Sequence, residues 1–473
     1  MNRNSPQQWA CNEWYARLNT PKRVLIICAS LCGVLALGGG IGWAYLNIPP
    51  VVHAPVPVLP TPNAFDYDMR AAKALTDLPT LRLATALEFL YHEGMYDPAR
   101  AKSDSIPAGA PIGGVPHAAH PMPAPPLPPP ISLSEIDALV RANHTALTLL
   151  HEGFAYPYQQ PPAGPQNKAL PCLGHLADFL RLVGTCAAQR GAWHEALSYN
   201  LDALHLGADI ARGGGCNSAL MGARISNSVR LDAWTAIPHL SRLQARIATA
   251  RMEAIWRARV PFAATLENER WESLSYFADL QRDPRWRELV RSLSTDSTHA
   301  SPVTGWLRLY LTSKRAFIRD VSAIYDAEIA NARCPYYMRN TFPTPSAGLL
   351  TQLWTVYPDM RLQIEKQQVQ NALLTVALAL QTYRAEHGAY PPALANLAPG
   401  YLHAVPIDPF AVDGQLHYTR TPDGYRLYSV GPDGKDNGGV PSAEGRQQPG
   451  GPRGGPGISQ FSTGDILAGV TLY

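Results

Sequence analysis

The hydrophobic pattern begins with one long apolar run near the N-terminus. Residues 24–46 contain no charged side chain. At ~1.5 Å of rise per residue, a helix of this length extends about 34 Å, which is enough to cross the apolar layer of a bilayer. Trp43 and Tyr45 stand near its end, where aromatic rings favour the interface between membrane and water. The pattern predicts a transmembrane helix.

Charges on either side of this run predict its orientation. Arg17, Lys22 and Arg23 precede it, and no charged residue follows until Asp66. Basic flanks stay on the cytoplasmic side, so the bulk of the chain should lie outside the cytoplasm, in the periplasm of a cell with two membranes. A cleaved signal peptide would have a shorter apolar core and a small-x-small site. We therefore expect an uncleaved anchor.

Two proline-rich stretches separate the anchor from the remaining chain. Residues 47–64 should form an extended, stiff stalk. Residues 104–131 contain few apolar side chains that could join a core, so this second stretch is predicted to be a disordered linker, with a proline-motif ligand as the alternative. Residues 65–103 between them should be a helical segment.

Beyond the linker, apolar residues recur at helical spacing. Leu176, Phe179 and Val183 share one face of a predicted helix. Ser134 is a candidate N-cap for an earlier helix that Gly153 would end. Further helices are expected over residues 195–211, 218–237, 240–259, 261–280 and 306–332. This part should be a helical array rather than a sheet.

One stretch of this array resembles part of a tetratricopeptide repeat. Residues 187–199 resemble the turn and the start of the second helix, with small Ala196 and Ala203 where two helices would approach and with Trp193 and Tyr199 as fillers. No second copy follows at a period of about 34 residues. An irregular helical pair is therefore favoured over a solenoid.

The C-terminal part combines a long helix with short strands. The apolar positions that predict the helix recur in steps of three and four: Leu362, Val369, Leu373, Val376 and Leu380. Gly388 can end this helix in the left-handed conformation. Residues 415–420 and 425–430 read as strands joined by a turn at residues 421–424. The prediction is one helix packed on a small antiparallel sheet.

The order of these C-terminal motifs resembles the soluble domain of the type II secretion major pseudopilin. The matching motifs are residues 388–391, 408–410 and 425–434, and the resemblance spans about residues 359–467. Pseudopilins of this family bind calcium in the loop after the last strands through carboxylates and backbone carbonyls. The resemblance therefore implies a calcium site at Asp433, Asp436 and Asp465.

Two departures from the family limit this resemblance. The chain lacks the Gly-aromatic-Thr processing site, and hundreds of residues separate the anchor from Leu362. A glycine- and proline-rich insertion at residues 438–457 lengthens the loop before Asp465. We interpret the region as a reused domain rather than a pilin subunit. Residues 133–237 also resemble uncharacterised membrane-anchored bacterial proteins that end in such a domain, and that family implies no activity.

Composition argues against one class of partner and does not decide whether the cysteines form disulfides. The net charge is +3 and charged residues make up 16% of the chain, below the ~25% of an average domain, so nucleic acid is not expected as a partner. Four cysteines follow the anchor and could form two disulfides or remain as buried thiols: Cys172, Cys186, Cys216 and Cys334.

The other motifs that could be catalytic or metal-binding are interpreted as structural. His92 and His151 each precede a Glu-Gly pair, which is typical of a helix end. Glu267, Glu269 and Glu272 are interpreted as helix-surface residues that pair with arginines rather than as catalytic carboxylates. Residues 212–215 lack the GxGxxG pattern and should connect two helices. No nucleophile signature appears.

The predicted fold class is mainly α, with an N-terminal transmembrane helix, an irregular helical array and a small C-terminal α+β domain. The segments are a cytoplasmic segment 1–23, the transmembrane helix 24–46, the stalk 47–64, a helical segment 65–103, the linker 104–131, a helical domain 132–347 and the pseudopilin-like domain 348–473. The leading hypothesis is a non-enzymatic binding or scaffolding protein with a protein partner. The alternatives are a hydrolase assembled from scattered residues and a component related to type II secretion.

Overall fold

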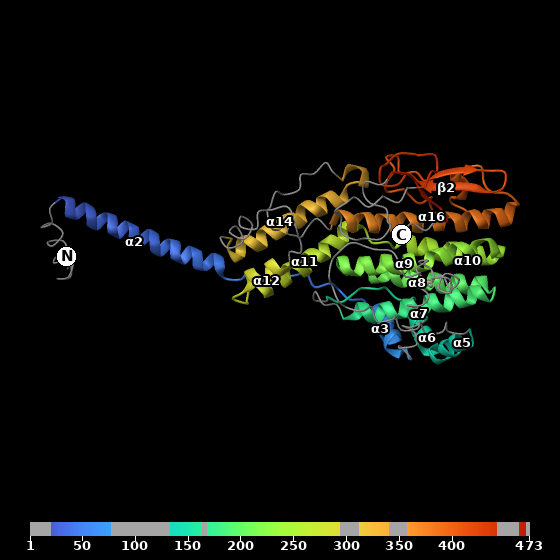
Figure 1. The fold of residues 1–473 in the computed structure, drawn as a ribbon, viewed down its shortest axis with the longest axis horizontal. Helices are drawn as coiled ribbons and strands as arrows, with labels where there is room; N and C mark the ends of the chain where they lie inside the picture. The colour runs from blue at the N-terminus through green and yellow to red at the C-terminus, as the bar shows by residue number, and fades with distance from the viewer. Residues whose placement is uncertain are drawn as a thin grey trace, which may run out of the picture. The chain divides into compact units, whose positions relative to one another are not determined.

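The computed structural model of the chain describes residues 20–76, 133–162, 168–293, 312–339, 357–441 and 463–469. These residues are mainly helical, with a small three-stranded antiparallel sheet (Figure 1). The chain divides into two compact units. The first contains Met1–His53, Leu274–Ile324 and Pro345–Leu353, and the second contains Ala54–Ser273, Tyr325–Thr344 and Trp354–Tyr473. The prediction of a mainly helical chain with a short sheet is confirmed.

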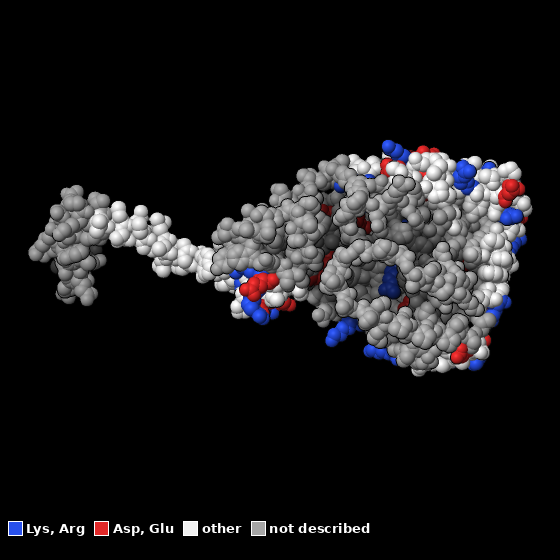
Figure 2. All heavy atoms as spheres, in the orientation of Figure 1, with Lys and Arg blue, Asp and Glu red and all other residues white. Residues whose placement is uncertain are grey.

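The first unit contains the apolar N-terminal helix. Helix α2 spans Thr20–Asn47, and within it Ile27–Asn47 is long and apolar enough to cross a membrane. Figure 2 shows no acidic or basic atoms along the part of α2 whose side chains are described. Arg315 donates from Nε to the carbonyl oxygen of Tyr45 (3.0 Å), which also accepts from the backbone nitrogen of Ile48 (3.3 Å), so a cation lies at the carbonyl end of α2.

Three further helices lie wholly or partly in the first unit, and one of them is α11 at Phe262–Leu280, which enters this unit at Leu274. Helix α12 spans Trp286–Leu293, and helix α14 spans Lys314–Arg333 and continues into the second unit. Trp286 packs edge-on against Phe317 with ring centroids 5.5 Å apart. The predicted helix over residues 306–332 is confirmed where the structure describes it, and residues 306–311 lie outside the described residues.

The second unit begins with α3, which spans Ala64–Ala74 and packs against α6. Asn63 fixes its start, because its Oδ1 accepts from the backbone nitrogen of Phe65 (3.2 Å) and its Nδ2 donates to the carbonyl of Gln159 (2.8 Å). One side chain therefore caps α3 and joins it to the segment after α6. Residues 48–63, which belong to the predicted stalk, contain no helix.

The prediction of a single helix between Ser134 and Gly153 is wrong. The structure has two helices, α5 at Leu133–Ala142 and α6 at His144–Gly153, and Ser134 lies inside α5 rather than at its cap. The break occurs at Asn143, whose Nδ2 donates to the carbonyl of Leu139 (2.8 Å) while its Oδ1 accepts from the backbone nitrogen of Thr76 (2.7 Å). A long-range contact thus interrupts the helix. The predicted end at Gly153 is confirmed.

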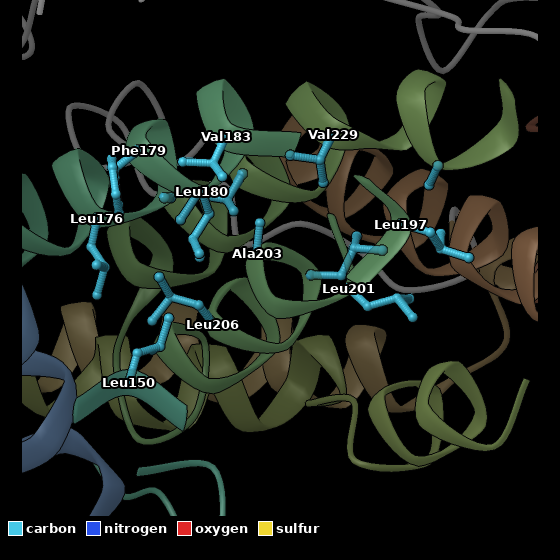
Figure 3. Packing of buried hydrophobic residues seen from close by; sticks show 14 of the residues in the cluster. Leu150, Leu176, Phe179, Leu180, Val183, Leu197, Leu201, Ala203, Leu206 and Val229 are labelled. Carbon is cyan, nitrogen blue, oxygen red and sulfur yellow. The ribbon is translucent and has the colours of Figure 1, made fainter. Parts of the chain in front are cut away.

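The helical array follows, and its elements are α7 at Ala169–Gln189, α8 at Trp193–Ile210, α9 at Cys216–Ala236, η1 at Ile237–His239, α10 at Arg242–Arg257 and α11 at Phe262–Leu280. The ends of α8 to α11 agree with the predicted ranges to within about two residues. Figure 3 shows part of the core that α7, α8 and α9 share, with Leu180, Leu201 and Val229 contributed by successive helices.

Small residues allow α8 and α9 to cross at backbone contact. A Cβ built on Gly222 would lie 2.2 Å from the carbonyl oxygen of Gly207, and one built on Gly207 would lie 2.9 Å from that of Gly222. Ala196 and Ala203 on α8 are fully buried, as the repeat-like pattern predicts, and Trp193 stacks on His239 with centroids 4.2 Å apart.

Helix α16, at Tyr357–His387, is buried on two sides. Leu374 and Leu378 belong to the core of the helical array, whereas Val369 and Val376 belong to a second core under the sheet. Figure 1 accordingly shows α16 between the sheet and helices α9 and α10. Gly388 ends α16 with φ +74° and donates to the carbonyl of Arg384 (2.8 Å), as predicted.

The sheet has the order β1-β2-β3, with β1 at His417–Arg420, β2 at Tyr425–Ser429 and β3 at Ile466–Leu467. Two short 3₁₀ helices, η2 at Tyr336–Met338 and η3 at Leu394–Leu397, complete the described elements. The predicted hairpin is confirmed, since the backbones of Thr421 and Gly424 bond to each other across the turn. The third strand was not predicted, because two residues are too few to show an alternating pattern.

The glycine crossing gives a test of the helical array. Gly222→Ala should lower the free energy of unfolding by about 1–3 kcal/mol, because the new methyl group meets a backbone carbonyl and the helices must separate. Thermal unfolding of the full chain in detergent measures this.

Gly174→Ala is the matched control. A Cβ there meets only the Met221 side chain at 3.7 Å or more, so this helical glycine should gain roughly 0.5–1 kcal/mol from its lower unfolded-state entropy. Equal stability changes in the two variants would contradict the close crossing.

Candidate calcium-binding loop

Residues 430–441 after β2 and residues 463–465 before β3 form one loop region. Gly431 has φ +72°, and a Cβ built on it would lie 2.3 Å from the carbonyl oxygen of Gly464, which itself has φ +107°. Only residues without a side chain permit this approach. The glycines therefore bring the two segments together at their backbones.

Asp465 fastens the second segment to the first. Its side chain is 0% exposed, and its two oxygens accept from the backbone nitrogens of Asn437 (3.2 Å) and Gly439 (2.7 Å). Its own nitrogen donates to the carbonyl of Val440 (2.8 Å). The chain thus returns to this loop after the insertion that lengthens it, and Asp465 lies beside the segment that carries the other two predicted ligands.

Asp433 and Asp436 are held within the loop by hydrogen bonds from backbone amides. Asp433 accepts from the backbone nitrogens of Lys435 (3.1 Å) and Gly464 (3.4 Å). Asp436 accepts from the nitrogen of Gly438 (2.8 Å), which lowers the pKa of its carboxyl group. Both carboxylates are accordingly positioned by the amides that surround them.

The three carboxylates influence one another electrostatically. Burial raises the pKa of Asp465, and the negative charges of Asp436 and Asp433 raise it further, although the amides of Asn437 and Gly439 oppose the shift. Protonation of Asp465 therefore favours the folded loop, and this stabilisation is lost as the pH rises through its folded-state pKa. A bound cation would oppose the same repulsion at neutral pH.

The donor set suits calcium in its chemistry, since carboxylate oxygens are hard ligands. The geometry is that of a loop closed by hydrogen bonds, because backbone N–H groups point at the Asp465 oxygens. Within the described ranges, no group of three His, Cys, Asp or Glu side chains is arranged to hold a metal ion. Calcium coordination by Asp465 would therefore require its carboxylate to exchange amide partners for the ion.

Neighbouring residues that the sequence did not single out support the loop. Tyr428 donates its hydroxyl to Asp436 (3.0 Å) and stacks on His417, whose Nδ1 lies 3.3 Å from the same carboxylate. His417 and Tyr428 are directly paired in the β1–β2 register. The register of the predicted hairpin could have placed them together, but nothing local linked them to Asp436.

Asp408 is a second residue whose role the sequence did not reveal. It is buried and accepts from the backbone nitrogen of Phe410 (2.9 Å), the hydroxyl of Ser429 (2.9 Å) and the backbone nitrogen of Val430 (3.1 Å). One carboxylate therefore fixes the end of β2 from which the candidate loop departs. Burial raises its pKa, and these hydrogen bonds lower it.

The interpretation of Glu269 and Glu272 as surface residues paired with arginines is wrong. Glu269 accepts from the backbone nitrogen of Cys216 at the start of α9 (2.7 Å), and a Cβ on Gly215 would lie 2.4 Å from the same carboxylate oxygen. Burial and the nearby Glu269 charge raise the pKa of Glu272 to about 7. Residues 212–215 join α8 to α9 as predicted, and Gly215 makes room for these carboxylates. Glu267 does pair with an arginine at the surface (Arg333, 2.6 Å).

His151 lies in the last turn of α6, as predicted, and also has a buried partner. Its Nε2 lies 2.8 Å from Asp202 Oδ2, and Arg251 donates to the other Asp202 oxygen (2.6 Å). The bond to Asp202 raises the pKa of His151. Their pairing therefore stabilises the fold at low pH and is lost as the pH rises through that pKa. His92 lies outside the described residues.

The remaining candidates do not assemble a catalytic cleft in the described part of the chain. A cavity of about 40 Å³ lies between helices of the second unit and is lined by Trp256, Arg259 and Asn371 among others, with neither His151 nor Glu269. Cys172, Cys186, Cys216 and Cys334 are free thiols, of which Cys186 and Cys216 are buried.

Comparison of the chain with protein-family profiles, with curated proteins and with solved structures finds no significant match. The candidate function therefore depends on the geometry described above.

The cap at Cys216 gives a test on one helix. Glu269→Ala should lower the free energy of unfolding by roughly 1–2 kcal/mol, because it leaves the backbone nitrogen of Cys216, the first residue of α9, without its acceptor. Glu267→Ala on the same helix should change it by less than about 0.5 kcal/mol, since its ion pair is exposed. Chemical denaturation of both variants measures the difference, and an equal effect would exclude the cap.

Proposed function

We propose that this chain is a membrane-tethered binding or scaffolding protein whose C-terminal loop takes up calcium. The observation that carries the proposal is the position of Asp465, which is buried beside the loop that contains Asp433 and Asp436. Calcium would replace repulsion between these carboxylates with shared coordination. The role proposed for the ion is to secure β3 and the loop against β2.

The tether is proposed to be α2, with the second unit outside the cytoplasm. Support comes from the length and apolar surface of α2 and from the basic residues Lys22 and Arg23 near its start. In this orientation the loop would face a compartment in which calcium is more abundant than in the cytoplasm. A millimolar affinity would suffice there, as in other extracellular modules.

The proposed partner is another protein. The resemblance to pseudopilins supports a more specific form of this proposal, in which the chain has a role related to type II secretion. The hydrolase alternative receives less support. The cavity in the second unit is lined by amides, one guanidinium and apolar side chains that include Trp256, without a paired acid and base.

Calcium should raise the melting temperature of the full chain in detergent relative to chelator, and the increase should grow with the logarithm of calcium concentration. Helix α16 is buried on both sides, and isolating the C-terminal region would expose the side that packs on the helical array. The experiment therefore uses the whole chain. Asp465→Asn should abolish the calcium effect, because it removes a charged ligand at nearly constant shape. Identical melting in calcium and chelator would reject the site.

Asp413→Asn is the matched control for this experiment. Asp413 is exposed and accepts from the backbone nitrogen of Gln415 (3.0 Å) in the same kind of local turn as Asp433, but it lies outside the loop. This variant should retain the full response to calcium. Loss of the response in both variants would indicate a general effect of carboxylate removal rather than a site.

The proposed topology has its own test. A reporter fused after Tyr473 that is active only outside the cytoplasm should be active in cells, because Ile27–Asn47 of α2 is apolar and the basic residues Lys22 and Arg23 precede that span. A reporter active only in the cytoplasm should be silent at the same position. The opposite pair of results would reverse the orientation and place the loop in the cytoplasm.

A further inference from the structure

Two buried cations lie together between α9 and α16. Arg230 on α9 and Lys366 on α16 are each 2% exposed. Burial lowers the pKa of Lys366 to about 8, and the positive charge of Arg230 contributes to the shift. Removing one charge from water without a counterion is unfavourable, and a like charge nearby makes it more so. Such a pair requires a source of negative charge.

The acidic residues of these two helices do not supply it. On α9, Asp232 accepts from the hydroxyl of Thr185 (3.0 Å). On α16, Glu365 pairs with Arg361 (3.7 Å), Glu386 pairs with Arg242 (3.0 Å), and Asp359 is an exposed residue of the first turn. Within the described part of the chain, Lys366 makes no hydrogen bond or ion pair.

The polar groups around the two cations are rich in donors that lack acceptors. Arg230 donates to the side-chain oxygens of Asn227 (2.7 Å) and Gln370 (2.6 Å), which leaves its Nε buried without a partner. The bond to Gln370 fixes the orientation of that amide, because its oxygen must face the guanidinium. Its Nε2 is then also buried without a partner. Lys366 stands one turn before Gln370 on the same face of α16, so its ammonium group lies in the same region as the two buried donors without a partner, Arg230 Nε and Gln370 Nε2.

We propose that Arg230, Lys366 and Gln370 form a binding site for a small free oxyanion of the phosphate class. Two positive charges match a doubly charged tetrahedral anion, which offers enough oxygens for all three donors. The near-complete burial of both cations favours a free ion over a phosphoryl group attached to a larger molecule. A cavity of about 40 Å³ lies beside this region and is lined by Asn371, which accepts from Arg230 (3.5 Å), whereas Arg230, Lys366 and Gln370 do not line it.

Thermal unfolding of the full chain in detergent, with inorganic phosphate against chloride at equal ionic strength, tests the site. Low millimolar phosphate should raise the melting temperature of the wild-type chain, and sulfate should do so as well. Lys366→Met keeps the length of the side chain and removes the charge, so it should lose the response. Lys73→Met, at an exposed lysine of α3, should keep it.

Gln370→Glu gives an independent result, because it places a permanent carboxylate beside both cations. This variant should melt higher than wild type in chloride and should not respond to phosphate. A wild-type chain that melts equally in phosphate and chloride would overturn the proposal. So would an equal phosphate response in wild type, Lys366→Met and Gln370→Glu, or a response to acetate that matches the response to phosphate.

Discussion

Helix α16 is the element on which the second unit depends, because it is buried on two sides. Apolar residues surround it, with Leu374, Ala377 and Leu378 in the helical core and Leu373, Val376 and Leu380 in the core under the sheet. A helix of this kind cannot be stable with one partner alone, since the other side would expose a continuous apolar surface. The sheet and the helical array are consequently held together through one helix.

Buried polar groups then determine how the helices meet. Glu269 caps α9 from α11, Asp202 joins α6 to α10 through His151 and Arg251, and Arg230 joins α9 to α16. Each group is removed from water and so requires a partner with defined geometry. Apolar packing brings these helices together, whereas the polar contacts select one arrangement among several of similar apolar burial.

Periodicity in the sequence predicted most helices of the array and the β1–β2 hairpin, because those elements depend on neighbours three or four positions away or on a local turn. The failures involve contacts between distant residues. Asn143 breaks a helix through a bond to Thr76, and Glu269 caps a helix that begins at Cys216. In the candidate loop, the acidic positions followed from a family resemblance. The bonds from Asp465 to Asn437 and Gly439 follow only from the folded chain.

The central position of α16 also constrains how the protein is made. Its contacts reach far back along the chain, since Thr382 meets Thr249 (3.1 Å) and Gln370 meets Arg230 (2.6 Å). Helices α9 and α10 leave the ribosome well before α16 is synthesised, so the apolar surfaces that α16 will cover stay exposed during that interval. Exposed apolar surface of this kind invites aggregation and is what chaperones recognise. The chain should therefore need protection during synthesis until residue 387 has emerged.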